Sequence, residues 1–255
     1  MCLVVVALDA HPRYALLIAA NRDEFHRRAT AAAHWWHDGW LAGRDLQGGG
    51  TWLGIDRRGR WALLTNVREP QRFDAAAPTR GTLVPQLLRV ECGPAAALPG
   101  VVGPPGSRHN GFNLLAGTGA RASWASNRAS GVTPLAAGVH GLSNAALDTP
   151  WPKLQRAKAA LDAWTRDASA EPDDAFRFLA DTTPVADADL PATGVPLEWE
   201  RRLAPAFIIG SEYGTRSSTV VALNHGGEVT FVERSFDAGG RAVGEARHQF
   251  TLQPR

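Results

Sequence analysis

The stretch LVVVALDAHPRYALLIAANRDE, residues 3–24, decides the fold, and it follows directly on Met1-Cys2. Two apolar runs, Leu3–Leu8 and Tyr14–Ala20, flank a short polar segment that contains a proline. Apolar runs of this length, separated by turn-forming residues, are typical of paired strands. The sequence therefore predicts that this part of the chain is an antiparallel β-hairpin.

Four hydrogen-bonding side chains follow the second run: Asn21, Arg22, Asp23 and Glu24, hereafter the tetrad. Neighbouring strands lie about 4.8 Å apart, so the end of the second strand returns beside the start of the first. We therefore expect the tetrad to lie close to Cys2. An arginine beside a cysteine favours the thiolate. The alternative is a solvated turn with a local ion pair.

Cys2 is a candidate nucleophile that carries its own base. Once Met1 is removed, the α-amino group of Cys2, with an ordinary pKa of about 7.7–8.0, can accept the proton of the thiol, with a pKa of about 8.5. This is the N-terminal-nucleophile arrangement, in which an amine replaces the histidine of a catalytic triad. The alternative is a small apolar residue at the start of a buried strand, and the dipeptide alone favours that alternative.

The rest of the chain combines strand-like runs with a few helices. Helical spacing begins near Thr79 and stops at Gly93-Pro94, and an amphipathic stripe runs from Pro152 to Trp164. Hairpins dominate, which favours antiparallel sheets covered by helices. Another helix is expected at 173–179, a loop at 99–111, a polar proline-rich stretch at 182–205, and strands at 50–55, 61–66, 112–116, 122–126, 139–143, 207–209, 219–223, 229–234 and 247–251.

The length and composition of the chain limit the classes of function that it can have. The 255 residues favour one domain over the whole of 1–255, and a net charge of +2 gives no support for nucleic-acid binding. No stretch approaches the roughly 20 apolar residues of a membrane span, and no secretory signal is recognised, so a cytoplasmic protein is expected. The two cysteines, Cys2 and Cys92, exclude a four-cysteine zinc site.

Three further residues are candidates for binding. Asn66 and Asn144 follow predicted strands, where amide N–H groups can stabilise the oxyanion of acyl transfer. Asparagine is also an ordinary turn former. Arg216 lies at the start of a strand-like run and could bind a substrate carboxylate bidentately or form a structural salt bridge.

The run His34-Trp35-Trp36-His37 raises the question of a metal or haem. Histidines three residues apart with no later cluster of ligands are a weak zinc signal, so no metal site is expected. The nine tryptophans of the chain would suit a flat aromatic ligand, although aromatic residues usually serve the core. No cofactor is required, and haem stays open as a ligand.

At the tetrad the chain resembles the NRDE family, also called the transport and Golgi organisation protein 2 family. The resemblance covers almost the whole sequence. Besides the tetrad and Met1-Cys2, its blocks are AGRDL at 42–46, GGTWLG at 49–54, LTNVR at 64–68, GLSN at 141–144 and GTRSST at 214–219.

The resemblance implies one α+β domain, a four-layer αββα sandwich of two antiparallel sheets similar to N-terminal nucleophile hydrolases. It also implies roles for the candidate residues. Cys2 would be the nucleophile, and the tetrad of Asn21, Arg22, Asp23 and Glu24 would orient its amine and thiol. Asn66 and Asn144 would be oxyanion or substrate donors, and Arg216 and Trp52 would bind substrate.

A more distant resemblance connects the chain to cysteine hydrolases of linear amides, such as bile-salt hydrolases and penicillin V acylases. In those enzymes an arginine and an aspartate stand three residues apart, whereas Arg22 and Asp23 are adjacent. The individual roles within the tetrad are therefore not assigned. Two functions follow: hydrolysis of a small-molecule linear amide at its C–N bond by Cys2, or a non-catalytic protein that binds or traffics haem.

Overall fold

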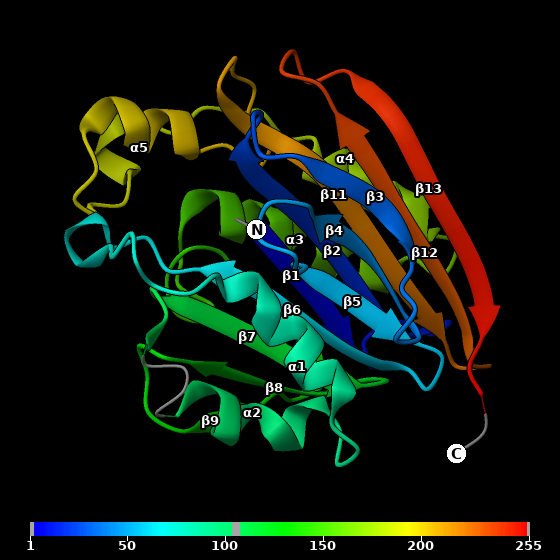
Figure 1. Ribbon diagram of the computed structural model, residues 1–255. Coiled ribbons are helices and arrows are strands. Elements are labelled where there is room, and N and C mark those ends of the chain that lie inside the picture. Colours follow the sequence, from blue (N-terminus) through cyan, green and yellow to red (C-terminus); the bar gives the residue numbers. More distant parts are fainter. Residues whose placement is uncertain (1–2, 104–107, 254–255) are drawn as a thin grey trace.

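The computed structural model describes residues 3–103 and 108–253. In these residues two antiparallel sheets pack face to face, and helices cover both outer faces (Figure 1). The first sheet has six strands in the order β10-β1-β2-β11-β12-β13, and the second has seven in the order β3-β4-β5-β6-β7-β8-β9. The predicted α+β class and the four-layer αββα arrangement are confirmed.

The elements have the following bounds. The first sheet contains β1 (Leu3–Leu8), β2 (Tyr14–Phe25), β10 (Gly138–Leu142), β11 (Tyr213–Asn224), β12 (Glu228–Phe236) and β13 (Ala242–Thr251). The second contains β3 (Thr30–Trp35), β4 (Trp40–Asp45), β5 (Leu53–Asp56), β6 (Arg60–Asn66), β7 (Phe112–Thr118), β8 (Arg121–Ser126) and β9 (Val132–Pro134). The helices are α1 (Leu83–Arg89), α2 (Pro94–Val102), α3 (Pro152–Arg166), α4 (Ala175–Leu179) and α5 (Leu197–Leu203).

Strand β1 is apolar throughout because both of its faces are covered. Leu3 and Val5 belong to the core between the first sheet and helices α3 and α4. Val4 and Val6 belong to the core between the two sheets. A strand buried on both faces is a continuous apolar run rather than an alternating one. A third core joins α1 and α2 to the outer face of the second sheet.

The structure corrects several predicted elements. Strand β2 continues to Phe25, so the tetrad lies within a strand and not after it. Helix α2 reaches Val102 into the stretch 99–111 expected to be a loop, and residues 207–209 are not a strand. Strands β3 and β4 were not predicted. Four consecutive polar residues suggested that the strand had ended. They remain in the strand because their side chains have buried partners, through contacts that the local sequence does not show.

One carboxyl group lies in the core between the sheets. Glu233 on β12 is 2% exposed and accepts hydrogen bonds from the Ala33 amide (2.8 Å) on β3 and the Thr219 hydroxyl (3.2 Å) on β11. It therefore ties the first sheet to the edge of the second. Burial raises the pKa of the Glu233 carboxyl to about 7, against the lowering effect of these hydrogen bonds and of Arg22.

Replacing Glu233 should change how stability depends on pH. Between pH 4.5 and 7 the folded protein retains a proton that the unfolded chain releases, so the free energy of unfolding falls as pH rises through this window. The shift corresponds to about 3 kcal/mol. We expect the wild-type protein to lose about 3 kcal/mol more than Glu233→Gln between pH 4.5 and pH 8 in urea unfolding. Glu228→Gln, exposed on the same strand, should follow the wild type, and parallel curves for wild type and Glu233→Gln would contradict the assignment.

Candidate functional site

The start of β1 is where the candidate segments meet. Leu3 pairs with Asn21 of β2, and on the other side Val4 pairs with Leu142 of β10. Both neighbours are antiparallel, so the end of β2 and the residues after β10 lie beside the first described residue. Cys2, the predicted nucleophile, lies outside the described residues.

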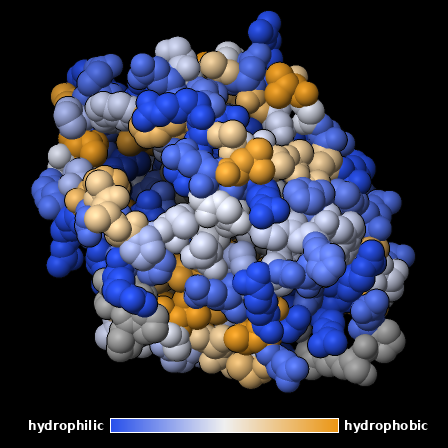
Figure 2. Space-filling model, in the orientation of Figure 1, coloured by the Kyte–Doolittle hydropathy of each residue, from blue (hydrophilic) through white to orange (hydrophobic). Residues whose placement is uncertain are grey.

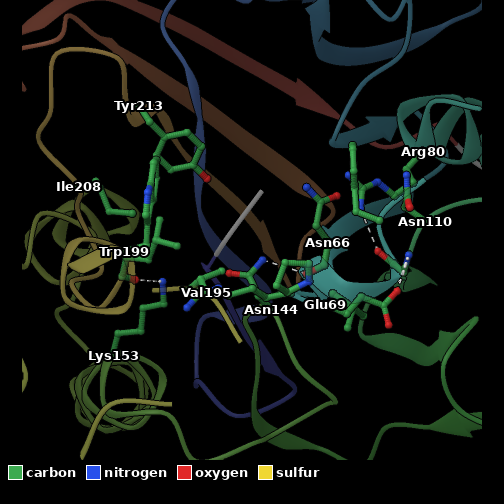
Figure 3. Close-up of a pocket in the computed structure, with 16 residues that line it drawn as sticks. Asn66, Glu69, Arg80, Asn110, Asn144, Lys153, Val195, Trp199, Ile208 and Tyr213 are labelled. Carbon is green, nitrogen blue, oxygen red and sulfur yellow. Dashed lines mark hydrogen bonds between the residues drawn. The ribbon is translucent and has the colours of Figure 1, made fainter. Parts of the chain in front are cut away.

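A pocket of about 400 Å³ lies between α5 and the segment that follows β6, and it is visible as a hollow in Figure 2. Figure 3 shows Asn66 and Asn144 near its middle. One side is mostly apolar and aromatic, and the other is polar. The apolar side contains Val195, Trp199, Leu203, Ile208 and Tyr213, and the polar side contains Glu69, Arg80 and Asn110.

Asn144 presents a hydrogen-bond acceptor to this pocket. Its side chain is held in place because Nδ2 donates to the Asn66 carbonyl at 2.9 Å, and its backbone carbonyl accepts from the Arg68 amide at 2.8 Å. The residue is 5% exposed, and its Oδ1 has no hydrogen-bond partner among the described residues. A buried acceptor without a partner costs about 1–3 kcal/mol. Asn144 Oδ1 is therefore suited to accept a hydrogen bond from an N–H group of a ligand.

Asn66 offers the complementary group. It ends β6 and lines the pocket, and its side-chain amide makes no hydrogen bond to another described residue. It is only partly buried. The Asn66 N–H groups are therefore free to act as donors, which is the role expected for an oxyanion-stabilising residue.

The tetrad is divided between the two faces of β2, because alternate side chains of a strand point to opposite sides. Asn21 faces the helices and is fully buried. Its Nδ2 donates to the carbonyls of Leu179 (2.7 Å) and Ala206 (2.8 Å), and its Oδ1 accepts from the Ser218 hydroxyl (2.6 Å). Asn21 therefore joins the first sheet to the segments that carry the pocket wall, and it does not line the pocket.

Asp23 lies on the same face of β2 as Asn21. It is 3% exposed and accepts a hydrogen bond from the Thr215 hydroxyl at 2.6 Å. The same hydroxyl accepts from the Ile208 amide at 2.9 Å. Because Ile208 lines the pocket, Asp23 acts through Thr215 to position the apolar wall.

Arg22 and Glu24 line a second, smaller cavity of about 80 Å³, which shares Asn66 and Arg80 with the first pocket. Arg22 is 5% exposed, and its guanidinium lies over the ring of Trp52 at 4.5 Å. Its Nη1 donates to the Thr30 hydroxyl at 3.2 Å.

The charge of Arg22 is incompletely compensated. Burial lowers the pKa of the Arg22 guanidinium, and the nearby carboxylates of Glu24 and Asp45 counteract this effect. None of the carboxylates that the structure describes lies within 4 Å of it. Glu24 accepts from the Phe25 amide at 2.8 Å and lies 3.8 Å from Arg28 Nε. A buried guanidinium of this kind is suited to stabilise an anion in the cavity.

Arg216 lies outside the pocket. Its Nη1 donates to the backbone carbonyls of Phe25, His26 and Arg28 at 3.0–3.1 Å, which fixes the turn after β2. The structure thus gives Arg216 backbone acceptors in place of the substrate carboxylate considered from the sequence. Trp52 is 5% exposed and, like Arg22, lines the small cavity.

Several pocket residues were not found from the sequence. Lys153, Trp199 and Tyr213 line the pocket, yet no spacing or motif distinguishes them.

The motif His34-Trp35-Trp36-His37 lies in and after β3 beside a different, open surface pocket. Across residues 3–103 and 108–253, no group of three or more His, Cys, Asp or Glu residues is placed to hold a metal ion. No helix in this part of the chain has the length and apolar character needed to cross a membrane.

Comparison with known proteins gives matches that cover most or nearly all of the chain. A family model described as Transport and Golgi organisation 2 matches residues 1–238. The Transport and Golgi organization protein 2 homolog of Bos taurus is 35% identical over 277 residues, which cover 99% of this chain and 100% of the relative. The Homo sapiens homolog is 34% identical with the same coverage. Among solved structures, a Caenorhabditis elegans N-acylethanolamine-hydrolyzing acid amidase ortholog has a TM-score of 0.43 and 11% identity, covering 86% of this chain and 92% of that one.

Substitutions of two adjacent tetrad residues should have opposite effects on stability. Asn21→Leu leaves two buried carbonyls without their donor, and we expect it to lower the free energy of unfolding by about 2–4 kcal/mol. Arg22→Met removes a buried charge and keeps an apolar stem against Trp52, so we expect no loss, or a gain of about 1 kcal/mol. Urea unfolding of both variants measures the contrast. A loss for Arg22→Met as large as that for Asn21→Leu would show that the Arg22 charge is well compensated.

Proposed function

This chain belongs to the Transport and Golgi organisation 2 family, and we propose that it hydrolyses a linear amide with Cys2 as the nucleophile. The observation that carries the proposal is the unpartnered Oδ1 of Asn144, a buried acceptor in the pocket beside the start of β1. An amide substrate supplies the N–H that this atom lacks. An ester does not, so the geometry favours an amide.

Covalent geometry supports Cys2 as the nucleophile. A residue joined to Leu3 by a trans peptide bond has its Cα about 3.8 Å from that of Leu3. Leu3 is paired with Asn21, and β10 delivers Asn144 to the same end of the sheet. The end of β1 from which the chain continues to residue 2 therefore lies beside Asn21 and the segment that carries Asn144, and this supports the choice of Cys2.

The proposed reaction proceeds in two steps. After removal of Met1, the α-amine takes the proton of the Cys2 thiol, and the thiolate attacks the substrate carbonyl to form a tetrahedral intermediate. Asn66 donates to the oxyanion, while Asn144 Oδ1 accepts from the amide N–H. The C–N bond breaks as the ammonium returns its proton to the leaving amine. Water then attacks the thioester, and the acid and the free thiol are released.

Arg22 has the electrostatic role in this scheme. Its buried guanidinium, over Trp52, lowers the free energy of a nearby thiolate relative to the thiol. Glu24 lines the same small cavity at the sheet interface. Asn21 and Asp23 act at a distance, since they hold the segments that carry the pocket wall. The proposal thus gives Arg22 an electrostatic role and gives Asn21 and Asp23 positioning roles.

Competitive alkylation of the two cysteines tests the proposal. Cys92 is exposed and serves as an internal reference for an ordinary surface thiol. With limiting iodoacetamide at pH 7 we expect Cys2 to be labelled at least about tenfold faster than Cys92, and Arg22→Met to remove most of this advantage. Peptide mass spectrometry gives both rates in one sample.

Intact-mass measurement of the same sample provides the control for processing. The expected mass lacks Met1. Retention of Met1 on every molecule, or labelling of Cys92 with Cys2 spared, would overturn the proposal. A saturable Soret shift with haem, together with an unreactive Cys2, would instead support the carrier function.

A further inference from the structure

Strand β13 forms one edge of the first sheet, because β12 is its neighbour on one side and no described strand pairs with it on the other. Figure 1 shows it as the outermost strand on its side of the molecule. It has 10 residues, the upper end of the usual range for strands. A long edge strand offers a row of backbone N–H and C=O groups to a further strand. Lysine and proline, which commonly protect such edges, are absent from the sequence of β13.

The hydrogen bonds to β12 show which backbone groups of β13 remain available. Leu252, directly after the strand, donates its amide to the Gly227 carbonyl at 2.8 Å. Because backbone groups alternate between the two sides of a strand, the even-numbered residues face β12 and the odd-numbered residues face outward. The pairing with β12 is regular over residues 244–251, so Glu245 and Arg247 both have outward groups. Neither of these two amides donates to another residue in the described parts of the chain, 3–103 and 108–253.

Two opposite charges lie side by side at the middle of this edge. Glu245 and Arg247 are two residues apart on one face of β13, and Glu245 Oε1 lies 3.1 Å from Arg247 Nε. Glu245 also pairs with Arg234 at 3.0 Å, and Arg247 pairs with Asp173 at 2.6 Å. All four side chains are partly exposed to solvent. The edge therefore presents one anion and one cation in a fixed order, without net charge.

We propose that β13 pairs with β13 of a second copy of this chain, antiparallel and around a two-fold axis at Ala246. In this register Glu245 of each copy lies opposite Arg247 of the other. Each opposed pair exchanges two backbone hydrogen bonds, because both residues have outward groups. The first sheets of the two copies then continue into one sheet across the dimer.

The charges select both this register and a second copy as the occupant. Each Glu245 has Arg247 of its own strand on one side and Arg247 of the other copy opposite, so nearest neighbours in the cluster always differ in sign. A shift by two residues places Glu245 opposite Glu245, or Arg247 opposite Arg247, and like charges directly opposite are destabilising. A shift by one residue opposes outward groups with inward ones. A second copy supplies the complementary order of charges through the two-fold symmetry itself.

The other face of β13 leaves room for the pairing. At the axis Ala246 meets Ala246 of the second copy, and beside it Gly244 meets His248. A Cβ at Gly244 would find no atom of the described residues within 4 Å, so the space there is open. His248 is held toward β3 by a contact of its Nε2 with the Ala33 carbonyl at 3.3 Å. A small residue therefore lies opposite the imidazole in each half of the interface.

Charge reversal at the two positions tests the pairing. In a self-dimer, Arg247→Glu places acids opposite acids and Glu245→Arg places bases opposite bases, so we expect each variant to self-associate at least about tenfold more weakly than the wild type. In an equimolar mixture every acid of one variant lies opposite a base of the other. We therefore expect the mixture to form a heterodimer with an affinity close to that of the wild type. Sedimentation velocity at micromolar to near-millimolar concentration measures all four samples.

Arg166→Glu is the matched control, with the same change of charge on the same sheet. Arg166 lies on α3, which covers β1 and β10 at the opposite edge, and its side chain is 70% exposed. We expect this variant to associate like the wild type. None of the three substitutions touches the pocket or residue 2, so the outcome is independent of whether Cys2 is catalytic.

Amide hydrogen exchange reports on the backbone of the same edge. The Glu245 and Arg247 amides become donors in the dimer, so we expect their exchange to slow as the protein concentration rises, and to stay fast in either charge-reversed variant alone. A wild-type protein that stays monomeric at near-millimolar concentration would refute the proposal. A dimer that both reversals leave unchanged, or a mixture of the two variants that stays monomeric, would refute it as well, since the copies would then not meet at β13 in this register.

Discussion

Burial of β1 on both faces is the constraint on which the site depends. Its side chains alternate between the core beneath the helices and the core between the sheets, so a shift by one residue would exchange the two sets. The register with β2 and β10 is therefore strongly specified. This register places Leu3 opposite Asn21, and the chain that leaves β10 brings Asn144 to the same end of the sheet. The site geometry is thus a consequence of packing throughout the first sheet.

The same alternation of side chains explains why the four consecutive polar residues of the tetrad lie in different environments and have different roles. Asn21 and Asp23 face the helices, where Asn21 donates to two backbone carbonyls and Asp23 Oδ1 accepts from the Thr215 hydroxyl. Arg22 and Glu24 face the other sheet and line a cavity. The first pair stabilises the fold, whereas Arg22 carries a cost of burial that the nearby carboxylates of Glu24 and Asp45 offset only in part. A linear motif does not show this division, because the face of each residue depends on β2 continuing to Phe25.

Elements with clear local periodicity were predictable from the sequence. The hairpin of β1 and β2 and the stripe of Leu154 and Leu161 on α3 are examples, since their apolar residues fall on one face or one strand. Asn66 and Asn144 were found because both follow strand-like runs. Lys153 and Trp199 were not identified from the sequence. They line the pocket only because the fold brings them close to residues that are distant in the sequence. The bond from Lys153 to the Leu203 carbonyl spans 50 positions.

Electrostatic contacts, more than apolar burial, place the apolar wall of the pocket. Helix α5 has seven residues, too few to be stable alone, and its one buried residue is Glu200. Glu200 accepts from Arg68 and from Thr193, and Arg68 lies over the Trp151 ring at 4.9 Å. A buried ion pair adds little net stability over an apolar contact, but the loss of one partner is costly. The ion pair therefore acts mainly on position. It holds α5 over the pocket in one register, and it directs Trp199, next to Glu200 in the sequence, into the pocket.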